Sequence, residues 1–188
     1  LDRQVAAERR LALRTVEASM DQLAMFPAAE FDIVIHPVST CYVPDVAPVY
    51  REVARITREG GLYISQHKQP ASLQGALEPS PQGYELRVPY YRNGPLPPVA
   101  GSRLREEGTL EYLHRWEQLL GLLCRSGFVI EDLVEPFHAD ATSASGEFGH
   151  RCRYLAPYVR IKARRKSAAG QDSTRAELWV PGGKSDRE

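Results

Sequence analysis

The clearest pattern of apolar and polar positions lies between residues 31 and 65. Residues 31–35 (FDIVI) form an almost continuous β-branched and aromatic run, which is typical of a strand covered on both faces. In residues 46–58 apolar side chains recur near helical spacing, and Asp45 stands where a helix N-cap is expected. A Gly-Gly pair ends this helix, and residues 62–65 form a second apolar run. The pattern predicts a β-α-β unit.

Further elements are predicted on both sides of this unit. Residues 1–10 have the composition of the end of a helix, and residues 11–16 (LALRTV) alternate as a short strand does. Residues 109–124 carry an apolar stripe at helical spacing, and residues 128–134 and 154–166 are strand-like. Helices that alternate with strands across short turns predict an α/β domain with a largely parallel sheet.

Two segments do not fit this alternation. Residues 69–108 are rich in Pro and Gly and contain one strand-like stretch, residues 84–91, so we expect a lid or an inserted hairpin. Residues 167–188 are polar, and we expect them to be disordered. The predicted domain therefore covers residues 1–166.

Composition narrows the class of protein. The 24 Lys and Arg balance 24 Asp and Glu, so no overall field favours nucleic acid or an anionic membrane. Three widely spaced cysteines make a disulfide framework improbable and favour a reducing compartment. No window approaches the ~18 apolar residues of a membrane span. We expect a cytoplasmic protein without nucleic-acid or membrane partners. Because Leu1 is not Met, we also expect that part of the natural polypeptide is missing or was removed by processing.

Several short motifs occur in a characteristic order. They are FDIVIH at residues 31–36, VPD at 43–45, ARITREGG at 54–61 and RSGF at 125–128. In this order they resemble the fourth strand, the following helix, the fifth strand and a later helix-to-strand junction of class I S-adenosylmethionine-dependent methyltransferases. The resemblance extends over roughly residues 1–136.

The resemblance implies a Rossmann-like, mostly parallel sheet with flanking helices, which lacks the first β-α-β portion. In the family a glycine-rich loop approaches the methionine part of S-adenosylmethionine, and an acidic residue after the second strand holds the ribose. The 14 glycines of this chain include no G-x-G-x-G. We therefore expect an N-terminally truncated methyltransferase that acts on a small-molecule acceptor and whose transfer is impaired in this chain.

Candidate cofactor residues follow from the resemblance and from a general rule. Ligands of open α/β sheets bind beyond the carboxyl ends of the strands, so residues 19–21 and 36–42 would line one crevice. By position the adenine-binding carboxylate falls at Ser19, with Asp21 as its possible substitute and Met20 packed on the ring. The predicted cofactor-binding residues are Ser19, Met20, Asp21, His36, Pro37 and Val38.

His36 is the predicted catalytic residue. A neutral imidazole titrates near pH ~6.5 and can accept a proton from an acceptor at neutral pH. The alternative is that His36 donates to a backbone carbonyl beside Pro37 and only closes the strand. The predicted acceptor-binding residues are Tyr42, His67 and Tyr91.

Two of these acceptor assignments compete with structural ones. His67, with Lys68 and Gln69, either orients an acceptor or lies in a solvated loop. Tyr91 belongs to a group of aromatic residues that either forms a wall over the acceptor or packs the lid onto the core. The group comprises Tyr84, Tyr90, Tyr91 and Trp116.

No metal site is predicted, since His138, His150 and Cys152 do not have the spacing of a zinc motif. A non-enzymatic function remains the alternative to methyl transfer. A sheet without its first strands would expose an unpaired edge, through which the chain could bind another polypeptide or self-associate.

Overall fold

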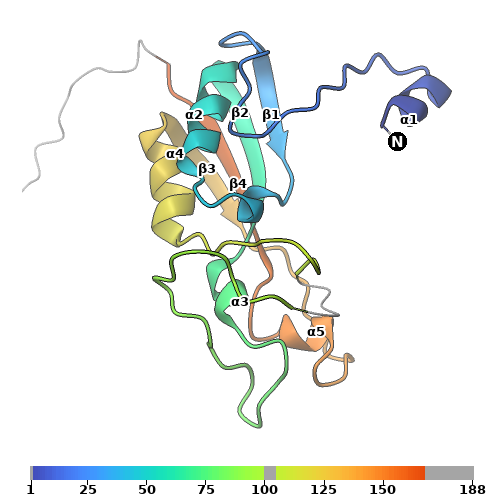
Figure 1. Ribbon diagram of the computed structural model, residues 1–188, viewed down its shortest axis with the longest axis vertical. Helices are drawn as coiled ribbons and strands as arrows, with labels where there is room; N and C mark the ends of the chain where they lie inside the picture. Colours follow the sequence, from blue (N-terminus) through green and yellow to red (C-terminus); the bar gives the residue numbers. More distant parts are fainter. Residues whose placement is uncertain (1, 100–104, 168–188) are drawn as a thin grey trace, which may run out of the picture.

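One sheet organises the protein, which a computed structural model describes over residues 2–99 and 105–167. Its strands are β1 (Phe31–His36), β2 (Thr57–Lys68), β3 (Phe128–Val134) and β4 (Tyr158–Arg165), in the order β1-β2-β4-β3 (Figure 1). β1 and β2 are parallel, and β4 is antiparallel to β2 and to β3. β1, β2 and β3 therefore share one direction, and the predicted α/β class is confirmed.

The predicted β-α-β unit is present. Its helix, α2 (Ala47–Ile56), begins where the Asp45 carboxylate accepts from the Ala47 N–H at 2.9 Å. The helix ends two residues before the predicted position, because Thr57 is extended and its hydroxyl donates to the Val53 carbonyl at 2.6 Å. Gly60, at φ +72°, makes the turn that precedes the regularly paired part of β2.

The predicted helix over residues 109–124 is wrong in its first half. Helical backbone begins with a π-helical turn, η2 (Glu117–Gly121), and continues as α4 (Leu122–Arg125). Residues 109–115 are irregular because their backbone bonds go elsewhere: the Tyr112 N–H donates to Cys41, and the Glu111 carbonyl accepts from Leu96. Tertiary contacts thus override the helical periodicity.

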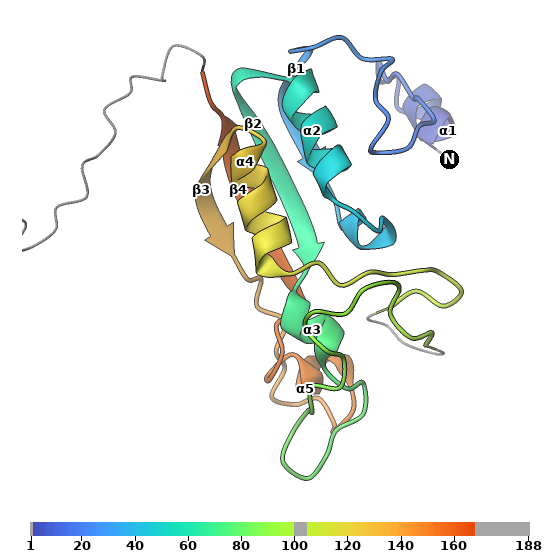
Figure 2. The ribbon, with the colours of Figure 1, turned by 60° about the vertical axis from the view of Figure 1, so that its left-hand side comes forward.

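Helices α2 and α4 cover the same face of the sheet, as Figure 2 shows. The main core lies between this face and the two helices, and Ser126-Gly127 ends α4 as predicted. No helix in the described ranges is long and apolar enough to cross a membrane. The most completely buried side chains of this core are Val46, Val49, Tyr50, Tyr63, Leu123, Phe128, Val159, Ile161 and Ala163.

The predicted strand over residues 11–16 is absent. These residues follow α1 (Asp2–Glu8) as irregular backbone, and Leu11 and Leu13 are 60% and 56% exposed. Within the described residues no strand pairs with this segment. A single unpaired strand leaves its backbone groups to water and is not stable.

The predicted lid contains α3 (Pro70–Gln74) and packs near α5 (Phe148–Arg151), which belongs to a later loop (Figure 1). The strand expected over residues 84–91 is absent apart from one bridge between Gly75 and Leu86. Pro89 interrupts this stretch and lacks an N–H for a ladder. Residues 100–104 of the lid and 168–188 of the expected tail lie outside the described residues.

The sheet face opposite α2 and α4 is open. At its β1 side Ile33, Ile35 and Ile64 are 52%, 73% and 37% exposed. At its β4 side it carries Arg160, Lys162 and Arg164, two of which pair with Glu131. β1 is also the edge strand of the described sheet. This side of the protein therefore combines an apolar surface with a strand that has one unpaired edge.

Candidate functional site

The candidate site lies at the carboxyl ends of the parallel strands β1 and β2. His36 is the last residue of β1, and His67 is the last but one of β2. The loop between β1 and α2, which contains the short helix η1 (Thr40–Tyr42), crosses this edge. The structure thereby joins both predicted histidines to residues of one loop.

His36 is hydrogen-bonded at both ring nitrogens. Nδ1 lies 2.8 Å from the Tyr63 hydroxyl, and Nε2 lies 2.8 Å from the Ser39 hydroxyl. The Ser39 hydroxyl donates to the Pro37 carbonyl at 3.1 Å, so it accepts from His36 Nε2–H. Nδ1 is then the acceptor of the Tyr63 proton. The Pro37 carbonyl therefore accepts from Ser39 and not from His36, so the backbone-closing alternative proposed for His36 is not what the structure shows.

The chain of hydrogen bonds continues to His67. Ser65 lies beside Tyr63, where its hydroxyl acts against the rise that burial causes in the pKa of the phenol, and the same hydroxyl lies 2.8 Å from His67 Nε2. His67 Nδ1 lies 2.8 Å from the Thr40 hydroxyl. One consistent assignment has Thr40 donating to His67, His67 to Ser65, and Ser65 to Tyr63. Six side chains from two strands and one loop therefore form one directed chain.

Burial keeps the histidines of this region neutral. Desolvation lowers the pKa of His67 to about 3 and also lowers the pKa of His36 and His114. The His114 ring lies 2.9 Å from the Thr40 carbonyl and so fixes the loop. Burial raises the pKa of the Tyr63 phenol. Neutral imidazoles and a protonated phenol are the forms that can pass a proton along hydrogen bonds.

Lys68, next to His67, belongs to a buried ionic cluster. Its ammonium group donates to Glu111, which is fully buried and also accepts from Arg105 Nε at 2.6 Å. The Tyr42 ring lies 5.9 Å from the Lys68 ammonium, and its hydroxyl donates to Glu106 at 2.9 Å. His67 and Lys68 are 1% and 9% exposed, so the solvated-loop alternative for them is wrong.

The predicted adenine-side residues lie in a turn beside α2. The Ser19 hydroxyl donates to the Asp21 carboxylate, and Met20 packs against the main core together with Val34. Across the described residues no hydrogen bond or ion pair joins this turn to residues 36–38. Asp21 is partly exposed, which leaves its carboxylate accessible to a ligand.

The ring contacts of Tyr91 are with Tyr90 and Arg115 and not with His36 or His67. It is 77% exposed, stacks edge-on with Tyr90 at 5.3 Å and lies under the Arg115 guanidinium, also at 5.3 Å. Trp116 packs against the main core, which agrees with the packing alternative for the aromatic group. No group of three metal-ligating side chains occurs in the described parts of the chain.

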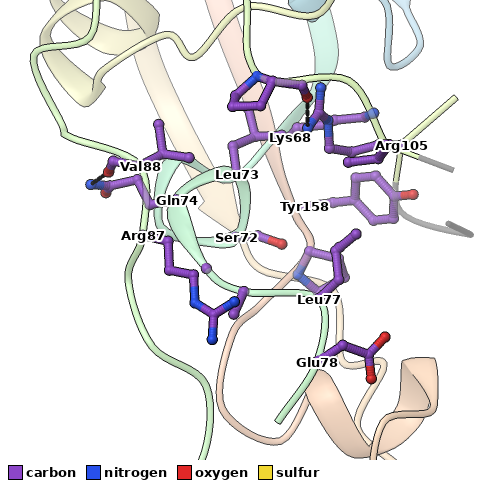
Figure 3. Close-up of a pocket in the computed structure, with 15 residues that line it drawn as sticks. Lys68, Ser72, Leu73, Gln74, Leu77, Glu78, Arg87, Val88, Arg105 and Tyr158 are labelled. Carbon is purple, nitrogen blue, oxygen red and sulfur yellow. Dashed lines mark hydrogen bonds between the residues drawn. The ribbon is translucent and has the colours of Figure 1, made fainter. Parts of the chain in front are cut away.

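A pocket of about 330 Å³ lies beside the Lys68 cluster, between α3, the lid and the start of β4. Figure 3 shows Arg105 and Tyr158 on one side and Gln74, Arg87 and Val88 on the opposite side. Lys68 lines this pocket and directly follows His67 in β2, while His67 and its hydrogen-bond partners are not among the residues that line it.

Sequence reasoning did not identify Tyr63 and Ser65 as members of the site. Their alternation with His67 along β2 was the available signal, since residues 63, 65 and 67 face the same side of a strand. Lys68 and Glu111 form an ion pair although they are 43 positions apart in the sequence, so no local pattern predicts this contact.

Comparisons with known proteins agree with this architecture. A family described as "Methyltransferase domain" matches residues 1–65. The uncharacterized methyltransferase YbaJ of Bacillus subtilis (strain 168) is 30% identical over 138 residues, which are 71% of this chain and 54% of that protein. The chain thus spans about half the length of this curated relative.

Solved structures show the same fold. An S-adenosylmethionine-dependent methyltransferase from Mesorhizobium loti superposes with a TM-score of 0.64 at 22% identity, covering 88% of this chain and 77% of its own. A putative S-adenosylmethionine-dependent methyltransferase from Listeria monocytogenes gives 0.62 at 15% identity, covering 89% and 78%. The sequence matches, the observed sheet and these structures together support a class I S-adenosylmethionine-dependent methyltransferase.

Proposed function

We propose that this protein takes part in S-adenosylmethionine-dependent methyl transfer to a small-molecule acceptor. One observation carries the proposal beyond family membership: a directed chain of hydrogen bonds ends at His36 and Ser39, at the carboxyl end of β1. Ligands of open α/β sheets bind at this edge. The pocket lined by Lys68 is of a size that suits a small molecule.

The residues present fit part of the cofactor. Asp21 offers an accessible carboxylate for an adenine amino group, and residues 36–38 lie at the strand end where the sulfonium is expected. No counterpart of the family's glycine-rich loop or ribose-binding acidic residue occurs in the sequence. When bound, S-adenosylmethionine supplies the methyl group; what this chain supplies is one side of the site and the groups that handle a proton.

His36 would accept the proton of the acceptor at Nε2. In the arrangement observed, this nitrogen donates to Ser39. Reversing the hydrogen bonds between the side chains exchanges the tautomers of both histidines and makes Nε2 an acceptor, and the Ser39 hydroxyl then donates to Nε2 in place of the Pro37 carbonyl. Tyr63 and Ser65 would then be positioning residues that hold the two imidazoles in matching tautomers.

A second function is favoured by the open edge of β1. Ile33 and Ile35 are exposed side chains of β1, whose outer edge has no partner strand in the described sheet. Such edges pair readily with another chain. We propose that the chain self-associates through β1, which would also cover part of the open face.

Cofactor binding is tested by titrating S-adenosylmethionine into this chain and into the longest polypeptide encoded by its reading frame. We expect heat of binding from at least one of them in isothermal titration calorimetry. A form that binds and in which Asp21→Asn weakens binding by roughly tenfold would support the adenine assignment. Absence of binding by both forms would contradict a methyltransferase function.

The function of His36 is tested in the form that binds cofactor. His36→Gln keeps a side chain that can donate and accept but cannot take up a proton near neutral pH. We expect methyl transfer to fall by about 10²–10⁴-fold with little change in cofactor affinity. His150→Gln, which alters a histidine of α5 bonded to the lid residue Tyr84, is the control and should stay near the unsubstituted rate. Equal rates for both variants would refute a base at His36.

The dependence of the free energy of unfolding on pH tests whether His67 is neutral in the folded protein. His67 titrates near pH ~6.5 when unfolded, but only at about 3 when folded. The unfolded state therefore binds the extra proton, and stability falls as pH drops from 6.5 toward 3, by up to about 1.4 kcal/mol per pH unit. Urea unfolding at pH 7, 6, 5 and 4 should show a steep decline that becomes shallower in His67→Gln. An equally steep decline in that variant would contradict a buried neutral His67.

Self-association through β1 is tested with Ile35→Lys, which places a charge on the exposed face beside the edge. Light scattering after size exclusion should show a dimer or larger species for the unsubstituted chain and a monomer for the variant. Leu86→Lys, at an exposed apolar position of the lid, should leave the association unchanged. An unsubstituted chain that is monomeric at every concentration would contradict this proposal.

A further inference from the structure

The lid pocket has a mainly apolar wall. Leu73 and Leu77 contribute from α3 and the residues after it, and Val88, Pro97 and Pro157 contribute from the lid and the approach to β4. A pocket of about 330 Å³ with such a lining suits the apolar body of a small organic molecule. The charged residues that line the pocket are the cations Lys68, Arg87 and Arg105 and one carboxylate, the exposed Glu78.

A buried guanidinium stands directly behind one wall. Arg151 is 1% exposed, and its hydrogen bonds go to neutral acceptors: the Ala76, Ser72 and Gly75 carbonyls and the Ser72 hydroxyl. Among the described residues no carboxylate forms an ion pair with it. Buried charges are normally paired, so this cation leaves a positive field at the wall that Ser72 and Gly75 form.

Ser72 can carry this field into the pocket. Its hydroxyl oxygen accepts from Arg151 Nη1 at 2.9 Å, so its own proton is left to donate. No acceptor for that proton is present among the described residues. Ser72 lines the pocket, and Figure 3 shows its hydroxyl directed toward the side of Tyr158 and Arg105. A hydroxyl that is polarised by a guanidinium is a good donor to an anion.

Lys68 adds a second positive group on the pocket wall. Its side chain is 8% exposed, and its ammonium has three N–H donors, one of which is directed to Glu111. Glu111 accepts from both Lys68 and Arg105. Two cations therefore share this carboxylate. On the opposite side, the exposed Arg87 pairs with Glu85 at 3.1 Å and contributes little field.

We propose that the lid pocket binds an amphipathic organic acid, whose carboxylate is held by the Ser72 hydroxyl and the Lys68 ammonium and whose apolar body lies against Leu73, Leu77 and Val88. The inference deepens the proposed function, on which it rests, because this molecule would be the methyl acceptor. The link to the hydrogen-bonded side chains is Lys68, which lines the pocket and directly follows His67 in β2.

Two probes of equal chain length test the charge preference without cofactor. Octanoate and octan-1-ol are titrated into the full chain and followed by protein-observed NMR and calorimetry. Octan-1-ol is the more hydrophobic probe, so a purely apolar pocket would prefer it. We expect octanoate to bind at least about tenfold more tightly, with the largest shifts at Ser72, Leu73 and Val88.

Matched variants locate the anion site. Ser72→Ala removes only the hydroxyl, and Lys68→Met removes the charge but keeps the stem; each should reduce the octanoate preference to about threefold or less while octan-1-ol affinity stays constant. Arg160→Met, which removes an exposed cation on the open sheet face, is the control and should keep the full preference. Circular dichroism verifies that each variant folds, and Ser72→Ala carries the test if Lys68→Met does not.

Equal affinity for the two probes, failure of both to bind, or an equal loss of both in Ser72→Ala would overturn the organic-acid inference. These outcomes are distinct from failure of methyl transfer, because they are measured without S-adenosylmethionine. If the chain binds octanoate but not the cofactor, the organic-acid pocket stands and the methyl-transfer proposal fails. If the chain binds the cofactor but does not prefer octanoate, methyl transfer stands and the organic-acid pocket fails.

Discussion

Strand β2 buries a tyrosine, a serine, a histidine and a lysine within six residues, and each of these polar groups needs a partner that water cannot supply. His36 and Thr40 satisfy Tyr63 and His67, and Glu111 satisfies Lys68. Removing one partner would leave a buried donor or acceptor without a hydrogen bond, at a cost of about 1–3 kcal/mol. The loop after β1 and the approach to α4 are therefore held in place by the polar side of this strand.

The same requirement explains why the approach to α4 is not helical. A helix over residues 109–115 would use the backbone groups that now bond to Cys41 and Leu96, and it would alter the position from which Glu111 reaches Lys68 and Arg105. The buried carboxylate between two cations is worth more than the few tenths of a kcal/mol per residue that helix propensity offers. The site and the lid are consequently parts of one polar core.

The lid obtains its order from a second buried charge. Arg151 ties α5 to the carbonyls at the end of α3 and lies 5.7 Å from the Tyr84 ring, so two irregular segments far apart in sequence become one wall. A wall fixed in this way can carry an uncompensated charge because carbonyl dipoles surround it. The anion preference proposed for the pocket and the order of the lid then have one physical origin.

Local patterns determined much of this protein. Apolar runs and helical spacing located β1, α2, β2, β3 and β4, and the motifs around Asp45 and Gly127 located the ends of helices, because these features depend on near neighbours. His36 and His67 could be placed at one sheet edge because parallel strands end together. The strand at residues 11–16 could not be judged, since a strand exists only when another pairs with it. Only the tertiary structure decided the pairing of Lys68 with Glu111, the link from Thr40 through His67 to Tyr63, and the placement of Arg151 behind Ser72, because these contacts join positions that no periodicity relates.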